Sequence, residues 1–158
     1  MKDSFFIPIL FLIAFIFSII PLPDYLQIIM PEWIALLLFF FSLMNPERVG
    51  LFLALVLGII LDLFSGSLLG QHALSLLLPV AICLRLNLIV RVFPIWQLNV
   101  FIVIMLIIYE FILFWIDGVL SINIPISERI FPIISSVLVW PIILRYLPKL
   151  RDDISNRI

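Results

Sequence analysis

Charged residues are scarce in this chain, and their scarcity excludes an ordinary soluble domain. Of the 158 residues, 12% are charged and 65% are hydrophobic, whereas about a quarter of the residues in a typical soluble domain are charged. The mean hydropathy is +1.36. The sequence also lacks the alternation of polar and apolar residues that a membrane-spanning barrel requires. It therefore predicts an all-α integral membrane protein.

Cysteine and histidine each occur once, which limits the chemistry that the chain can perform. Cys83 lies in an apolar run and has no second cysteine with which to form an intramolecular disulfide. His72 alone does not make a recognisable zinc-binding set. We therefore expect no metal and no cofactor.

Proline, glycine or a charged residue interrupts the hydrophobic sequence at intervals that suit membrane-spanning helices of about 20 residues. The first apolar segment ends at PLPDY and not at a small-residue cleavage site, which indicates a retained helix. The interruptions predict a single transmembrane domain, residues 1–158, with six spans at about 5–20, 27–44, 49–66, 72–91, 95–116 and 130–147.

The basic residues predict the orientation of these spans. With a cytoplasmic N-terminus, Arg129 is the only basic residue in an outer connection. All the others fall on the cytoplasmic side, as the positive-inside rule requires: Lys2, Arg48, Arg85, Arg91, Arg145, Lys149, Arg151 and Arg157. Both termini are therefore expected in the cytoplasm.

Small residues recur at every fourth position along the third predicted span. Such a stripe lets another backbone approach closely, which favours helix packing in lipid. Glycines at the end of the stripe predict a tight reversal into the next helix. The candidate packing and partner-binding residues are Gly50, Ala54, Gly58, Asp62, Gly66, Gly70 and His72. The pattern leaves open whether the stripe faces a helix of this chain or of another protein.

Residues 58–74, GIILDLFSGSLLGQHAL, gather polar groups at this reversal. An acid at membrane depth is costly unless it has partners, so Asp62 should accept hydrogen bonds from loop N–H groups, Ser65 or His72. Three roles compete for the segment. The first is a Ser/His/Asp hydrolase, but the segment lacks the G-x-S-x-G motif of such enzymes. The second is a transport or ion-coupling site, which would use Asp62 and Glu110. The third, a structural corner, is the commonest role for such a pattern.

Glu110 lies seven residues before Asp117 and therefore on roughly the same face of one helix. Structural pairing with a neighbouring helix is the simpler interpretation of Glu110, and a proton site is the alternative.

The order of several short motifs resembles the MreD family of rod shape-determining membrane proteins. The motifs are PLPDYL, MPEWIALL, NPERVG, GIILDLFSGSLLG, PIWQ and VLVWPIIL, between about residues 20 and 150. The resemblance implies a component of the bacterial cell-elongation machinery, to which no catalytic activity is attributed. Its implied partners are MreC, RodA with its penicillin-binding transpeptidase, and MreB on the cytoplasmic side. The implied fold is similar to the six-helix substrate-binding subunit of energy-coupling-factor transporters.

These observations together predict a non-enzymatic scaffold in the bacterial inner membrane that contacts lipids and binds no nucleic acid. The glycine stripe would pack against the membrane helix of MreC, and the corner would orient the adjoining periplasmic segment. The alternative is a protein that binds or transports a small molecule or lipid in an outer-facing cavity lined by Asp62, His72 and Glu110. A structural corner should tolerate Asp62→Asn better than a proton site would.

Overall fold

The computed structural model describes residues 3–20, 23–122 and 124–157, and every regular element in these ranges is a helix. The prediction of an all-α fold is therefore confirmed. The elements are α1 (Asp3–Ile19), α2 (Asp24–Gln27), α3 (Trp33–Met44), α4 (Leu51–Ser65), α5 (Gln71–Val90), α6 (Ile95–Val119) and α7 (Ile126–Arg157).

Three of the described helices are long and apolar enough to cross a membrane. They are α5, α6 and the part of α7 from Ile126 to Leu147. The apolar parts of the other helices are shorter: Ile7–Ile19, Trp33–Met44 and Leu51–Ser65. The number of six spans and their orientation stay predictions.

The second predicted span, 27–44, is wrong at its N-terminal end. Helix α2 ends at Gln27 and α3 begins only at Trp33, so the intervening residues are not helical. Pro31 explains this break, because proline lacks an N–H donor and disfavours the helical conformation of the residue before it. With 12 residues, α3 is about 18 Å long, well short of the roughly 30 Å hydrocarbon core.

Helix α3 is instead the enclosed centre of the molecule. Its side chains from Ile34 to Leu43 are all buried, and it packs against α1, α5 and α7. A helix that is apolar on every side is expected in such a position. The short α3 therefore forms the core around which the longer helices are arranged.

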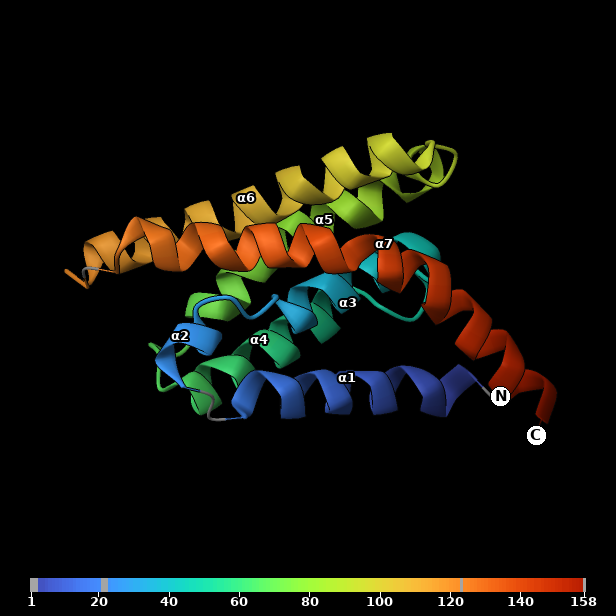
Figure 1. Ribbon diagram of the computed structural model, residues 1–158, viewed down its shortest axis with the longest axis horizontal. Helices are drawn as coiled ribbons and strands as arrows, with labels where there is room; N and C mark the ends of the chain where they lie inside the picture. The colour runs from blue at the N-terminus through green and yellow to red at the C-terminus, as the bar shows by residue number, and fades with distance from the viewer. Residues whose placement is uncertain (1–2, 21–22, 123, 158) are drawn as a thin grey trace.

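The helices form two groups on either side of α3 (Figure 1). Helices α5, α6 and α7 lie on one side, while α1 and α4 lie on the other, and the α4–α5 pair connects the groups through the most extensive helix contact. The start of α1 and the end of α7 lie at the same end of the molecule (Figure 1). Helix α7 begins at Ile126, four residues before the predicted span, and extends beyond it to Arg157.

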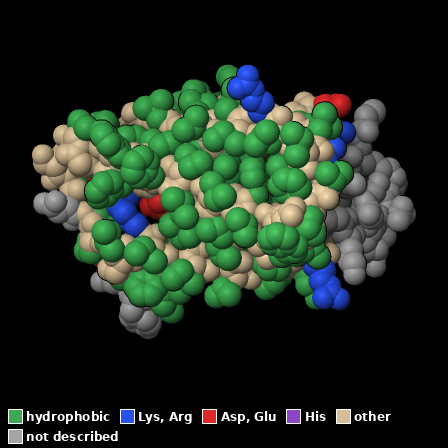
Figure 2. Space-filling view, turned by 90° about the horizontal axis from the view of Figure 1, so that it is seen from above, with side chains coloured by type: hydrophobic (Ala, Val, Ile, Leu, Met, Phe, Trp, Pro, Cys, Tyr) green, Lys and Arg blue, Asp and Glu red, His purple; other side chains and the backbone are tan. Residues whose placement is uncertain are grey.

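The outer surface suits a lipid environment. Large apolar side chains are exposed on α1 and on α4 to α7, among them Phe52, Leu88 and Leu138. The face seen in Figure 2 is covered mainly by hydrophobic side chains, and charged side chains are few on it. Such a surface is unusual for a soluble protein and is expected for a membrane protein.

Candidate functional site

The reversal between α4 and α5 is built on two glycines with left-handed backbone conformations. Gly66, which directly follows α4, has φ +66°, and Gly70, which precedes α5, has φ +99°. These angles are easily reached only by glycine. The N–H groups of Gly66 and Ser67 donate to the carbonyl oxygen of Asp62, a common way to end a helix. The tight corner predicted from the sequence is therefore present.

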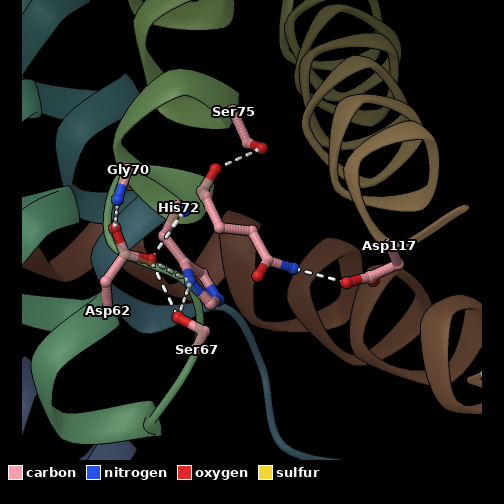
Figure 3. A network of polar contacts seen from close by, with 7 residues as sticks. Asp62, Ser67, Gly70, His72, Ser75 and Asp117 are labelled. Carbon is pink, nitrogen blue, oxygen red and sulfur yellow. Dashed lines mark hydrogen bonds and ion pairs between the residues drawn. The ribbon is translucent and has the colours of Figure 1, made fainter. Parts of the chain in front are cut away.

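The Asp62 carboxylate is buried at this corner and holds it together (Figure 3). Its Oδ1 accepts from the His72 backbone N–H at 2.8 Å, from His72 Nδ1 at 2.8 Å and from Ser67 Oγ at 2.9 Å. Its Oδ2 accepts from the Gly70 N–H at 2.7 Å. The expected bonds from loop N–H groups and His72 are confirmed, whereas the serine is Ser67 and not Ser65. Ser65 is the last residue of α4 and is exposed.

The arrangement of Ser67, His72 and Asp62 is not that of a hydrolase triad. A triad histidine uses one ring nitrogen for the serine and the other for the aspartate. Here Ser67 Oγ lies 3.3 Å from the same Nδ1 that contacts Asp62. The Ser67 hydroxyl donates to Asp62, so the histidine is not placed to activate it.

The bonding at Asp62 changes what is expected from Asp62→Asn. Both carboxylate oxygens accept N–H groups, so the amide NH₂ of asparagine would face a donor in either orientation and leave a buried N–H without an acceptor. We expect a loss of about 1–3 kcal/mol of stability, measured as a lower midpoint of thermal unfolding in detergent. Ser65→Ala, at the exposed serine nearby, is the control and should leave the midpoint unchanged. An unchanged midpoint in Asp62→Asn would show that the corner does not depend on these bonds.

The centre of the small-residue stripe faces α5 of the same chain. A Cβ built on Gly58 would lie 2.3 Å from the Ala73 Cα, so the two backbones are in direct contact. Ala54 and Asp62 are also buried. A Cβ on Gly50 or Gly66 would meet nothing within 4 Å. For Gly58, the question that the sequence left open is therefore answered: this glycine contacts α5 of the same chain and is not accessible to another protein's helix.

A second polar cluster joins α5, α6 and α7 close to the corner. Arg129, in the first turns of α7, forms ion pairs with Glu110 at 3.3 Å and with Asp117, both from α6. Asp117 also accepts from Gln71 Nε2 of α5 at 2.6 Å (Figure 3). All four residues are buried. The interpretation of Glu110 as a group that pairs with a neighbouring helix is confirmed, with Arg129 as its partner.

The two clusters flank a cavity of about 330 Å³. Its lining includes His72 and Glu110 but not Asp62, so one of the three residues expected to line an outer-facing cavity lies behind its wall. The sequence does not predict that Gln71 or Ser67 belongs to a site. Arg129 is notable in the sequence only as the one basic residue predicted on the outer side of the membrane. The full lining is Ser67, Gln71, His72, Glu110, Leu113, Asp117, Ile122, Ile124, Glu128 and Arg129.

An apolar groove of about 520 Å³ lies on the other side of the molecule, between α1 and α4. Direct contact between these two helices is sparse. The groove is lined without exception by apolar residues: Ile7, Pro8, Phe11, Leu12, Phe15, Ile16, Ile19, Leu53, Leu57, Ile60 and Phe64.

Comparison with known proteins places the chain among shape-determining membrane proteins. The family model described as "rod shape-determining protein MreD" matches residues 2–150. The chain is similar to the rod shape-determining protein MreD of Haemophilus influenzae, with 30% identity over 144 residues, which cover 91% of this chain and 89% of the relative. No solved structure matches the chain.

Proposed function

Since the chain belongs to the MreD family of rod shape-determining proteins, we propose that it is a non-enzymatic scaffold of the bacterial cell-elongation complex. In this proposal it crosses the inner membrane six times with both termini in the cytoplasm, in a fold similar to the substrate-binding subunit of energy-coupling-factor transporters. It binds MreC, and through MreC it helps to control lateral peptidoglycan synthesis by RodA and its partner transpeptidase. MreB is a further partner on the cytoplasmic side.

The apolar groove between α1 and α4 is the observation that carries this proposal. Helices associate in lipid by close packing, because lipid chains are as apolar as the side chains and little hydrophobic gain is available. A groove with an entirely apolar lining offers such packing to a single membrane helix. The Gly58 surface cannot do so, because α5 already occupies it. We therefore place the membrane helix of MreC in the α1–α4 groove and not on the glycine stripe.

The corner at Asp62 has a supporting role in this proposal. It fixes the end of α4, which forms one wall of the groove. The corner thus sets where the bound helix of MreC ends and how its adjoining periplasmic segment leaves the membrane. Control of the synthase then follows from the orientation of MreC and requires no catalytic group in this chain.

Ile16→Trp tests the groove as the site of MreC binding. Ile16 lines the groove and is 54% exposed, so a tryptophan can enter the groove without disturbing the core. We expect at least a tenfold reduction in the MreC that co-purifies in detergent or nanodiscs, which corresponds to about 1.4 kcal/mol.

Ile107→Trp is the matched control, because Ile107 is 50% exposed on α6 and lies outside the groove. It should retain normal MreC binding. Equal binding by the two variants would exclude the groove, and failure of the unmodified chain to bind MreC would exclude the scaffold proposal itself.

A further inference from the structure

The helices on the two sides of α3 differ in length. Helices α5 and α6 have 20 and 25 residues and the spanning part of α7 has 22, so these three are about 30, 38 and 33 Å long. On the other side, α1 has 17 residues and α4 has 15, so they are about 26 and 22 Å long. The hydrocarbon core of a typical bilayer is about 30 Å thick. The α1–α4 side is therefore too short for it, whereas the α5–α7 side is not.

The exposed apolar surface shows the same difference. On α6, exposed apolar side chains occur along the whole helix, and a helix longer than the hydrocarbon core can fit by tilting. On α4 they extend only from Leu51 to Phe64. Glu47 and Arg48 are exposed just before this stretch, and Ser65 is exposed just after it. The apolar stretch of α4 is therefore bounded by polar side chains at both ends.

Neither the corner nor the inclination of the helices makes up for the missing length. Leu68 and Leu69 are exposed in the corner, but neither is helical, and non-helical backbone does not face lipid within the hydrocarbon region. Helices α1 and α4 are inclined to each other (Figure 1), so at least one of them is tilted from the membrane normal. Tilt only reduces the depth of membrane that a short helix covers.

From these lengths we infer that the bilayer is thinner beside α1 and α4 than beside α5, α6 and α7, so that the α1–α4 face associates preferentially with phospholipids of short acyl chains. A bilayer thins locally around a helix that is shorter than its hydrocarbon core. Without thinning, the charge of Glu47 or the polar corner would enter hydrocarbon, which is costly. The inference rests on the proposed topology, in which α1 and α4 cross the membrane.

The apolar groove between α1 and α4 lies in this face. In the scaffold proposal the membrane helix of MreC therefore enters a thinned region, and its binding replaces short-chain lipid. The inference goes beyond that proposal, because it concerns the lipid around the chain whether or not MreC is present.

Competition between lipids at the two faces tests the inference, with the whole chain in vesicles and without MreC. Leu63→Cys on α4 and Phe111→Cys on α6 replace side chains that are 63% and 58% exposed and lie outside the groove. A fluorescent maleimide marks each new cysteine, while Cys83 is buried and should not react, which labelling of the unmodified chain verifies. Brominated dioleoyl-phosphatidylcholine quenches the label, and an unbrominated competitor lipid relieves the quenching.

At Leu63 we expect dimyristoleoyl-phosphatidylcholine to compete at least about threefold better than dioleoyl-phosphatidylcholine, because mismatch has a cost for each ångström. At Phe111 the longer lipid should compete equally well or better. The same relative affinity at both positions would overturn the inference. So would a label at Leu63 that no lipid quenches, because protein would then cover this face. Both results leave the proposed MreC interaction untouched.

Labelling at the two ends of α4 separates these failures from a failure of the proposed topology. Glu47→Cys and Leu69→Cys place cysteines at exposed positions before and after the helix. A membrane-impermeant maleimide added outside should react with Leu69→Cys at once, and with Glu47→Cys only after the membrane is opened. Reaction of both from the same side would overturn the crossing of α4 and the inference together. Reaction from opposite sides with equal lipid affinities at the two faces would overturn the inference alone.

Discussion

Gly58→Leu is expected to prevent α4 and α5 from packing. The first added carbon would lie 2.3 Å from the Ala73 Cα and 2.6 Å from the Ala73 N, and these backbone atoms cannot move aside as a flexible side chain can. Overpacking in cores commonly costs about 1–3 kcal/mol, and a clash with backbone should reach or exceed the upper end. The measurement is the fraction of protein that remains monodisperse in detergent over a temperature series, which should fall sharply.

Gly118→Leu is the control for this variant. Gly118 also lies inside a helix, α6, but a Cβ there would meet nothing within 4 Å. Its replacement should be neutral or should stabilise the helix by up to about 1 kcal/mol, because glycine is a poor helix former. If Gly58→Leu were as stable as Gly118→Leu, the close contact between α4 and α5 would be wrong.

The expected loss of α4–α5 packing also limits what Gly58→Leu can show about MreC binding. Loss of MreC from this variant would follow from loss of the α4–α5 hairpin, so it would not show direct contact between Gly58 and MreC. Variants in the α1–α4 groove are the informative ones, because exposed residues such as Ile16 can be changed without disturbing this hairpin.

The features that the sequence predicted correctly depend on local geometry. The four-residue spacing of Ala54, Gly58 and Asp62 places them on one face of a helix wherever that helix packs. Gly66 and Gly70 predict a corner because positive φ is a property of the single residue. The hydrogen bonding of Asp62 was predicted because an unpaired acid is costly at membrane depth. The structure provides donors to both of its carboxylate oxygens.

The features that the sequence did not reveal depend on contacts between distant segments. Gln71 and Asp117 are 46 positions apart, and Arg129 and Glu110 are 19 apart. No local spacing indicates that three helix ends meet. The same holds for the partner of the stripe, because a small residue favours close approach but does not specify which helix approaches. Pro31 is a local signal, but its effect was underestimated: the second span was predicted to begin at residue 27, and α3 begins only at Trp33.

Arg129→Met is expected to cause a large loss of stability as well. Arg129 is the partner of both Glu110 and Asp117, and all three side chains are at most 10% exposed. Removing one partner of a buried ion pair leaves uncompensated charge and typically costs about 3–5 kcal/mol. The midpoint of chemical or thermal unfolding in detergent should fall far below that of Arg145→Met, which changes a more exposed arginine of the same helix.

A charge-neutral variant separates loss of charge balance from loss of side-chain volume. Combining Arg129→Met with Glu110→Gln and Asp117→Asn removes all three charges, and the amide oxygen that the last change introduces can still accept from Gln71 Nε2. Buried ion pairs replaced as a unit are often tolerated, so the triple variant should recover most of the stability that Arg129→Met loses. If it does not, packing of the arginine, for example against the Phe114 ring 5.8 Å away, is its main role. Recovery would explain why a basic residue stands on the predicted outer side. Arg129 pairs with two buried carboxylates inside the helix bundle, whereas the positive-inside rule concerns charges in the connections between helices.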